Sequence, residues 1–346
     1  MKAHKHNLVQ CLLLITMLAL AINSSLVMDE IRKSLKICFS GIIPSLFPYM
    51  VLSSVFVSSI NNNSFRILCN LCKHLFGISP YGTGALICGV ICGYPIGPRC
   101  ACQLYKDKKI SASEAQSLIA YSNNCSPLFV IGAIGAGFLG NVKTGLILYC
   151  VQVSCAFISA IMLKPFTYSK YCVNTDSSNI KTFTEAICDS SLGIINICGY
   201  ILFFGAVGAM INPFICNLPV WLKCMIYTLL EITNGIKKIS TAIEPPALKL
   251  AFISMGLGWC GTAVHMQVKS ICDGVGLSMK KYYITKLCVS AFSAIITYII
   301  FGGKDILIPF VHSFFLRVIV FTILLGAILL YIQKKRGNPL FSKKLV

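Results

Sequence analysis

Long apolar stretches recur from one end of this 346-residue sequence to the other. A membrane-spanning helix needs roughly 20 mostly apolar residues to cross the hydrocarbon core of a bilayer. Several segments meet that length, and 56% of all residues are hydrophobic while only 12% are charged. One anchor helix does not explain this distribution. The pattern predicts an all-α polytopic membrane protein, with the lipid bilayer as its surroundings and a bacterial cell membrane as its location.

Positive charge dominates, with 30 Lys and Arg against 11 Asp and Glu. The basic residues gather in short connections and near both ends of the chain, as with Lys2, Lys5, Lys106, Lys108, Lys109, Lys334, Lys335, Arg336, Lys343 and Lys344. Membrane proteins keep positive charge at such places, where it sets orientation and attracts anionic headgroups. We therefore expect lipid and no nucleic acid as the partner of these residues, and both termini in the cytoplasm.

The sequence contains no motif that is typical of known enzymes or metal sites. Nineteen cysteines are spread through apolar segments, where they act as small hydrophobic residues. The Cys-x-x-Cys pair of Cys69 and Cys72 has no second pair at zinc-finger spacing. GxSxG, Walker A and HExxH motifs are absent, so we expect no enzyme, no metal and no cofactor other than a coupling ion, H⁺ or Na⁺.

The order of apolar and polar stretches predicts five parts. They are residues 1–36, with a first span over Leu8–Met28 and an interfacial segment Asp29–Lys36; residues 37–163, a first repeat; residues 164–182, a polar linker; residues 183–303, a second repeat; and residues 304–346, a last span and a basic tail. Counting the arms of hairpins separately, we expect eight to ten membrane segments.

In the first repeat, Ile37–Ile60 reads as a span kinked by its prolines, Pro44 and Pro48. Phe65–Phe76 alternates basic and apolar residues, which is typical of an amphipathic helix on the membrane surface. Tyr81–Leu104 carries too many Gly and Pro residues for one continuous span, so we expect a broken or re-entrant hairpin there.

The next segment, Ser111–Leu139, begins with the pattern of a capping box formed by Ser111 and Glu114. A short polar stretch at Ser122–Pro127 predicts that the helix over Ser111–Leu139 is broken there. We expect the glycines after the break, namely Gly132, Gly135 and Gly137, to let another backbone approach.

Further spans are expected at Leu146–Leu163, Ser191–Ile211, Val220–Ile232, Ala247–Trp259, Tyr282–Phe301 and Phe314–Ile332, with an amphipathic piece at Ala263–Cys272.

Three short matches in the same order suggest that the two halves arose by duplication. Gly41–Ile43 matches Gly199–Ile201, Leu75–Ser79 matches Leu229–Thr233, and Gly93–Pro95 matches Gly258–Cys260. Gly- or Pro-interrupted segments at corresponding places in two halves indicate a substrate site near the middle of the bilayer, because unwound backbone can bind a substrate or an ion. The alternative is that these breaks are only kinks that serve packing.

Several polar residues lie at or beside the breaks. Glu231 follows an apolar run, and a carboxylate at membrane depth is usually retained for coupling or binding; the alternative is an interfacial residue at a helix end. Arg99 can pair with an anionic substrate, or serve only as a cytoplasmic positive charge. Asn123, Asn124 and Ser126 can present amide and hydroxyl groups between two half-helices. His265 is either a proton relay or a packing residue.

The predicted substrate-binding residues are those at and beside the breaks: Gly93, Tyr94, Pro95, Gly97, Arg99, Ser122, Asn123, Asn124, Ser126, Glu231, Thr233, Asn234, Gly258, Trp259, Gly261, His265 and Gln267.

Four segments carry a family resemblance: Gly41–Pro48, Gly93–Gly97, Ser122–Phe129 and Leu229–Gly235. Together they resemble the sporulation integral membrane protein family called YlbJ, over nearly the whole chain. That family is grouped with the nucleoside-recognition or Gate-domain proteins, which are similar to concentrative nucleoside transporters in having duplicated halves with helical hairpins. Two places depart from the expected pattern, Pro98–Arg99 and Gly258–Gly261.

The resemblance implies a transporter that moves dipicolinic acid, or a similar small anionic metabolite, across the outer forespore membrane into the developing spore. Helix N-termini, an aromatic side chain and an Arg would suit a planar dianion. Two alternatives stay open: a membrane scaffold in spore envelope assembly, and a nucleoside or metabolite carrier of the same architecture. A homo-oligomer is also possible in any of these roles.

Overall fold

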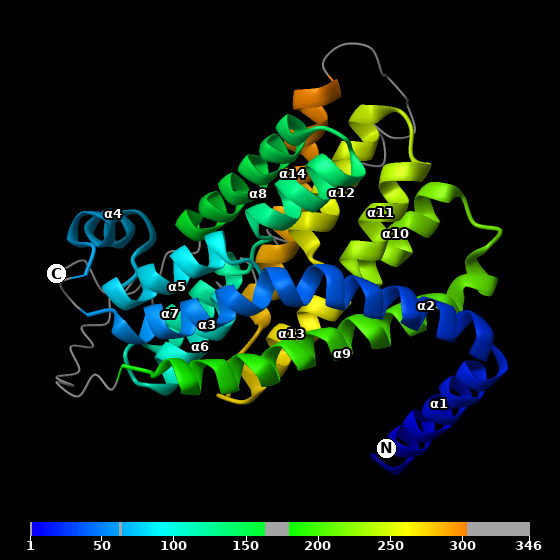
Figure 1. Cartoon of the computed structure of the whole chain (residues 1–346), viewed down its shortest axis with the longest axis horizontal. Coiled ribbons are helices and arrows are strands. Elements are labelled where there is room, and N and C mark those ends of the chain that lie inside the picture. The colour runs from blue at the N-terminus through cyan, green and yellow to red at the C-terminus, as the bar shows by residue number, and fades with distance from the viewer. Residues whose placement is uncertain (1, 62–63, 163–179, 303–346) are drawn as a thin grey trace, which may run out of the picture.

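The computed structural model describes residues 2–61, 64–162 and 180–302, and every regular element in these ranges is helical (Figure 1). In chain order the helices are α1 Lys2–Ile22, α2 Ser24–Ile37, the π-helical turn η1 Cys38–Ile42, α3 Ile43–Ser59, α4 Arg66–Phe76, α5 Pro80–Ile91, α6 Ile96–Lys106, α7 Ala112–Ser122, the π-helix η2 Leu128–Phe138, α8 Val142–Met162, α9 Phe183–Ile215, α10 Val220–Leu230, α11 Ile232–Ala242, α12 Pro246–Trp259, α13 Gly261–Asp273 and α14 Lys280–Gly302. The predicted all-α class is confirmed.

Five helical runs in the described ranges are long and apolar enough to cross a bilayer: Ser24–Ser59, Val142–Met162, Phe183–Ile215, Pro246–Asp273 and Lys280–Gly302. A sixth candidate consists of α4 and α5, which meet at 88°. The expectation of eight to ten segments stays a prediction, because it includes Phe314–Ile332 outside the described residues and counts the hairpin arms separately. These arms have only 11 or 12 residues, so at about 1.5 Å per residue each reaches about half the depth of the hydrocarbon core.

Parts of the predicted organisation lie outside the described residues: most of the polar linker (residues 163–179), and the last span Phe314–Ile332 with the basic tail. The first described helix after the linker, α9, begins with a complete capping box. The Thr182 side chain accepts from the Glu185 backbone N–H, and the Glu185 carboxylate accepts from Thr182 N at 2.9 Å.

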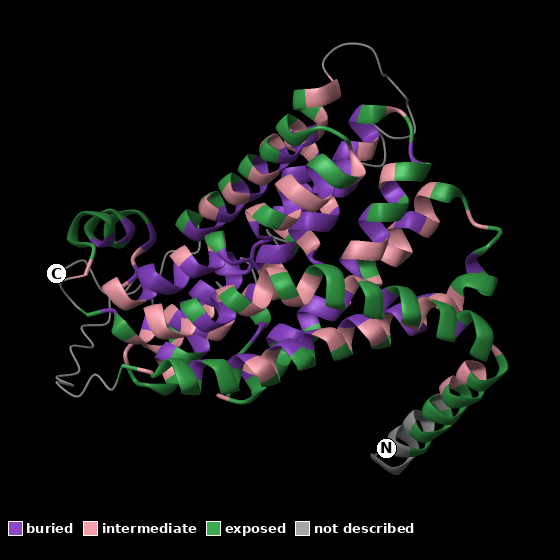
Figure 2. Cartoon of the chain, viewed as in Figure 1, coloured by how far each residue is buried: buried purple, intermediate pink, exposed green. Residues whose placement is uncertain are grey.

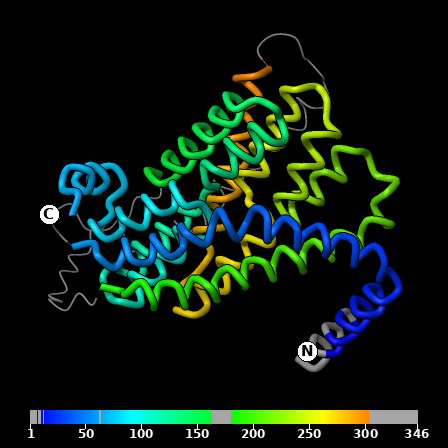
Figure 3. The backbone as a smooth tube through the Cα atoms, in the orientation of Figure 1, coloured from blue at the N-terminus to red at the C-terminus, as the bar shows by residue number. Residues whose placement is uncertain are grey.

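Two long helical runs lie side by side and antiparallel. One consists of α2, η1 and α3, and the other is α9 (Figures 1 and 3). Ser34 packs on Gly205, Met50 packs on Gly193, and the Ser58 hydroxyl accepts from Lys181 N, so the residue numbers run in opposite directions along the pair. The predicted spans on this stretch therefore need correction. Leu8–Met28 is not one helix because it breaks at Asn23, and Ile37–Ile60 belongs to a run that already begins at Ser24.

The charged segment Asp29–Lys36, expected at the interface, lies inside α2. Its charges pair one turn apart, Arg32 with Asp29 and Lys33 with Glu30, which supports the helix. The kink expected from the prolines stays a prediction; the structure shows a π-helical turn, η1, that ends immediately before α3, whose first turn contains Pro44, and such turns are a known cause of kinks.

Two kinds of interruption alternate along the rest of the chain. In the hairpins, α5 packs against α6 after a turn at residues 92–95, and α10 packs against α11 after a turn at Glu231. In the broken helices, α7 is separated from η2 at residues 123–127, and α12 is separated from α13 at Cys260. The predicted breaks in Tyr81–Leu104 and at Ser122–Pro127 are confirmed. The segment Ala263–Cys272, expected as a separate amphipathic piece, is part of α13, which counts with α12 as one candidate span.

Side-chain caps fix the starts of the short helices. Ser111 accepts from Glu114 N at 3.2 Å, as the predicted capping box requires, but the reciprocal bond is absent. The Glu114 carboxylate instead accepts from the backbone N–H and the hydroxyl of Ser79, both at 2.7 Å. Ser79 is itself the N-cap of α5, so this contact ties the first hairpin to α7.

Close backbone contacts hold the interrupted elements together. A β-carbon at Gly135 of η2 would lie 2.8 Å from the Cα of Gly145 in α8, which confirms the predicted close approach at this residue. At Gly132 and Gly137, no backbone of another element within the described ranges comes within 4 Å of the β-carbon position, so the predicted approach is not found there. Figure 2 shows that buried residues concentrate in the middle of the molecule, and the run α12–α13 is buried over 78% of its most apolar window.

We predict that Gly97→Ala lowers the free energy of unfolding by about 1–3 kcal/mol, because overpacking has that cost. The new methyl group would lie 2.8 Å from the Cα of Gly89 and would overlap the Ser122 carbonyl oxygen. Thermal unfolding of the purified protein in detergent measures the effect. Gly199→Ala is the matched control, since nothing lies within 4 Å of its β-carbon position. Equal effects of the two changes would contradict the packing described here.

Candidate functional site

The tips of the two hairpins and the gaps of the two broken helices meet in the middle of the molecule. In the first half, a β-carbon at Gly93 would lie 2.7 Å from Ser126 N, so the α5–α6 tip touches the gap between α7 and η2. In the second half, a β-carbon at Gly261 would lie 3.2 Å from Ile232 N, so the α10–α11 tip touches the gap between α12 and α13. Both glycines have a positive φ, +86° and +79°, which favours glycine.

A small cavity of about 60 Å³ lies between these elements. Its lining includes six of the predicted site residues: Gly93, Tyr94, Ser126, Glu231, Thr233 and Gln267. The rest of the lining comes from η1, α3, η2, α9, α11 and α13. Residues from both halves of the chain therefore form one pocket, which we call the central pocket.

Glu231 forms the tip of the second hairpin. It is only 4% exposed, and its two carboxylate oxygens accept from Thr233 N and Asn234 N, each at 2.9 Å. The carboxylate thus caps the positive N-terminal end of α11, which stabilises its charge. Glu231 is therefore a helix-end residue that also forms a wall of the central pocket.

A buried lysine, Lys286, lies next to the gap in the first broken helix. It belongs to α14, is 0% exposed, and its ammonium group donates to the backbone oxygen of Asn123. The thiol of Cys260, at the gap of the second broken helix, also approaches this ammonium. Among the ion pairs of the described residues, none includes Lys286. The lysine therefore links the two gaps and carries a positive charge that no described carboxylate contacts.

The Tyr282 hydroxyl, one turn before Lys286 on α14, bridges the two halves. It lies 2.9 Å from Asn123 Nδ2 and 2.9 Å from His265 Nδ1. The His265 ring meets Trp259 edge to face, with ring centroids 4.4 Å apart. The amide and the imidazole are thus held by a hydroxyl whose residue is almost fully buried.

Several buried polar atoms around the gaps have no hydrogen-bond partner within the described ranges: Ser122 Oγ, Asn123 Oδ1, Asn124 Oδ1, Trp259 Nε1 and His265 Nε2. Buried polar atoms are usually paired, and each exception calls for an explanation. Their concentration at the gaps makes this part of the protein a candidate binding site.

The remaining predicted residues support the site from nearby positions. Gly97 contacts the Ser122 carbonyl group, Gly258 contacts the backbone of Ser290, and Pro95 caps the start of α6. Asn124 donates to the Tyr121 carbonyl oxygen at 2.9 Å, and Asn234 contributes its N–H to Glu231.

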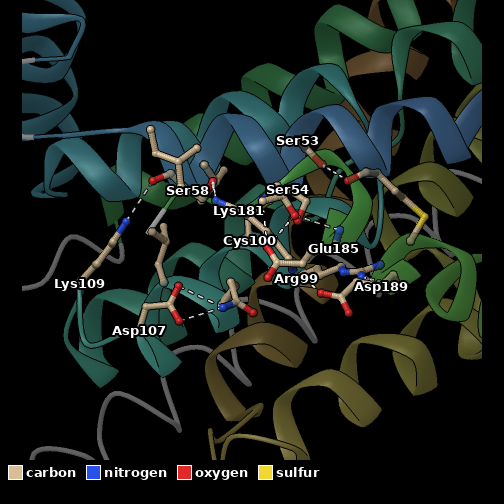
Figure 4. Close-up of a pocket in the computed structure, with 16 residues that line it drawn as sticks. Ser53, Ser54, Ser58, Arg99, Cys100, Asp107, Lys109, Lys181, Glu185 and Asp189 are labelled. Atoms are coloured by element: carbon tan, nitrogen blue, oxygen red, sulfur yellow. Dashed lines mark hydrogen bonds and ion pairs between the residues drawn. The ribbon is translucent and has the colours of Figure 1, made fainter. Parts of the chain in front are cut away.

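Arg99 lies outside the central pocket. Its guanidinium group packs on Gly193 of α9 and donates to the backbone oxygen of Asp189 at 2.7 Å. There it lines a larger cavity of about 800 Å³ between α3, α6 and the start of α9, which we call the lateral cavity (Figure 4). Three basic and three acidic residues face this cavity: Arg99, Lys109, Lys181, Asp107, Glu185 and Asp189.

Sequence reasoning missed three residues of the site: Lys286, Tyr282 and Gln152. A signal for Lys286 exists, because a lysine inside an apolar span is rare and usually functional. Gln152 of α8 donates to the Leu257 carbonyl oxygen at 3.2 Å, in the last turn of α12. Nothing in the local sequence of Tyr282 or Gln152 indicates which break each residue contacts, since both contacts join distant parts of the chain.

In a comparison with known proteins, this chain is 21% identical to the sporulation integral membrane protein YlbJ of Bacillus subtilis (strain 168), over 76% of this chain and 75% of that relative. No family model matches the chain. No solved structure matches it. The match shows distant homology and bears out the resemblance seen in the sequence. Together with the candidate spans, it makes the chain a multi-pass integral membrane protein.

We predict that Tyr282→Phe lowers the free energy of unfolding by about 1–3 kcal/mol, because it leaves the buried partners Asn123 and His265 without the shared hydroxyl. Chemical or thermal unfolding in detergent is the measurement. Tyr283→Phe, one residue along the same helix, is the control and should change stability by less than about 0.5 kcal/mol. A Tyr282 variant as stable as the control would mean that the bridge contributes nothing.

Proposed function

We propose that this distant homologue of the sporulation integral membrane protein YlbJ is a carrier of small anionic metabolites, with its substrate site at the central pocket, and that it is not an enzyme. The observation that carries the proposal is Lys286, a fully buried lysine at the point where both broken helices are interrupted. A buried charge is costly and is retained in membrane proteins mainly at substrate or ion pathways.

The charge distribution around Lys286 favours an anion. The one carboxylate that lines the central pocket, Glu231, is already bonded to the N-terminus of α11 and makes no ion pair with Lys286. A substrate carboxylate can supply the missing counter-charge, since a paired buried charge costs far less than an isolated one. The Trp259 indole N–H and the Ser122 hydroxyl, which have no partner among the described residues, are further donors for such a group.

The proposed carrier has two related halves, and the contacts across the molecule support this. Each half contains a long helix, a hairpin, a broken helix and another long helix in that order. After each broken helix, the next long helix sends one side chain to the end of the broken helix in the other half. Gln152 of α8 reaches Leu257, and Lys286 of α14 reaches Asn123. Gln152 follows Asn123 by the same number of residues as Lys286 follows Leu257.

This arrangement pairs the halves differently from the short sequence matches. It pairs the hairpin tip at Gly93–Pro95 with the tip at Glu231, and the gap at residues 123–127 with the gap at Cys260. The sequence matches paired Gly93–Pro95 with Gly258–Cys260 instead. We favour the first pairing because α5 turns back on α6, whereas α12 and α13 continue as one candidate span.

The lateral cavity supplies a route to the site. Its lining follows α3 from Ser58 to Met50 and α9 from Glu185 to Asp189, while the central pocket continues along the same two helices at Leu46 and Ile197. Between the two cavities, Met50 and Arg99 both pack on Gly193. We propose that movement of these two side chains opens the route, and that Arg99 meets the anionic substrate on its way inward.

For the substrate we propose dipicolinic acid, moved across the outer forespore membrane toward the spore. Its planar ring suits the aromatic wall formed by Tyr94 in the central pocket, and its carboxylates suit the Lys286 ammonium group, which lies beside the gap in the first broken helix and outside the pocket lining. The central pocket, at about 60 Å³, is far smaller than the ~300–1,000 Å³ typical of metabolite sites. Loading therefore requires the hairpin tips to separate from the gaps, a motion typical of carriers with alternating access.

We predict that the purified protein in liposomes takes up labelled dipicolinate, and that Lys286→Met and Glu231→Gln each reduce the initial rate at least about tenfold, since each removes a charge worth more than ~1.4 kcal/mol at the site. The variants should still elute as single folded species in size-exclusion chromatography. Lys280→Ala, which removes an exposed lysine from the start of the same helix α14, should leave the rate unchanged.

Uptake of uridine but not dipicolinate would redirect the proposal to a nucleoside carrier. A folded protein that moves neither compound would support a membrane scaffold instead. A scaffold would also tolerate Asn123→Ala and Glu231→Gln in sporulating cells, where a carrier would not.

A further inference from the structure

We infer that the ammonium group of Lys286 occupies a built-in cation site at the end of α7, so that this protein needs no sodium ion there. The role of this site in transport rests on the proposed carrier function. The contacts that carry it are independent of any substrate.

The end of α7 is a natural cation site. The last four carbonyl groups of a helix lack partners within the helix, and the helix dipole places negative charge at that end. In carriers with broken helices, such carbonyl groups and C-terminal ends commonly coordinate the coupling ion. Here α7 ends at Ser122, and the backbone oxygen of the next residue, Asn123, accepts from Lys286.

Further oxygen atoms belong to the same break. The side-chain oxygens of Asn123 and Asn124 are buried and have no partner within the described part of the chain. Carbonyl oxygens of this kind are ligands that hard cations prefer. The break therefore presents the atoms of a cation site, and a tethered ammonium already contacts one of them.

The other broken helix provides an internal comparison. Its C-terminal end, at Leu257, accepts from the neutral amide of Gln152 rather than from a charged group. A neutral donor is thus sufficient to satisfy a half-helix end in this fold, so satisfying the backbone does not by itself require a lysine. The positive charge at the first break has a further role, which we assign to replacing a mobile cation.

The test uses thermal unfolding of the full chain in detergent, without any substrate. For the wild type, exchanging choline chloride for sodium chloride at ~100 mM should leave Tm unchanged. Lys286→Ala opens the ammonium position, so its Tm should be lowered in choline and raised by roughly 5 °C in sodium, as binding to the folded state requires. Methylammonium should give a similar rise by replacing the lost group.

Two variants control for unspecific salt effects. Lys286→Met removes the charge but fills the space, so it should lose stability without regaining it in sodium. Lys280→Ala should behave as the wild type. A wild-type Tm that rises in sodium overturns the inference, and so does a Lys286→Ala variant that responds to neither sodium nor methylammonium. If Lys286→Ala does not fold, the wild-type measurement and sodium-dependent folding of this variant during purification decide the question.

Failure of this inference is distinct from failure of the proposed function. A sodium-stabilised wild type that still takes up dipicolinate would leave the carrier intact and change only its coupling ion. A sodium-insensitive protein that moves no anion would leave the cation site intact and remove the carrier.

Discussion

The structure depends on how the backbone N–H and C=O groups at helix interruptions find hydrogen-bond partners. Lipid offers no hydrogen bonds, so an interrupted helix is stable only where protein or water completes it. In this protein the four interruptions are placed against one another, with Gly93 against Ser126 and Gly261 against Ile232. Glycine is required at residue 93 because a side chain would overlap the backbone of Ser126, and the positive φ at both Gly93 and Gly261 favours glycine. Packing the interruptions against one another stabilises them and also brings their polar groups together in the middle of the molecule.

The interrupted helices also explain how Lys286 can be buried. A lysine in an apolar span would normally be excluded, and the end of α7 is one of the few places where partial negative charge can hold it. Its charge is only partly balanced there, because a carbonyl dipole is weaker than a carboxylate. Glu231 shows the opposite case, a carboxylate fully bonded to the N-terminus of α11. Helix ends of opposite polarity therefore hold one cation and one anion within the same interior.

Much of the fold was readable from the sequence, because Gly and Pro mark breaks regardless of tertiary context. The breaks at Gly93–Pro95 and Ser122–Pro127 were found in this way, and a helix over Phe65–Phe76 was predicted from its alternation of basic and apolar residues and is present as Arg66–Phe76. Contacts between distant segments were not readable. Arg99 was expected at the site because it follows a break, yet it faces α9 one turn away from the tip. Lys286 was not predicted because it lies within the continuous helix α14, where a single charged residue is the only sequence signal.

The unequal ends of the two broken helices bear on how the proposed carrier could work. If the two halves were chemically identical, exchanging their conformations would give equivalent states, and the substrate would have no preferred half. Here one end accepts from a lysine and the other from a glutamine. An anion at the central pocket is therefore drawn toward the first half, where the Lys286 ammonium lies beside Asn123. Because this lysine is part of the chain, its attraction for the anion persists in every state of the proposed carrier, so we expect release to depend on the proposed separation of the hairpin tips from the gaps.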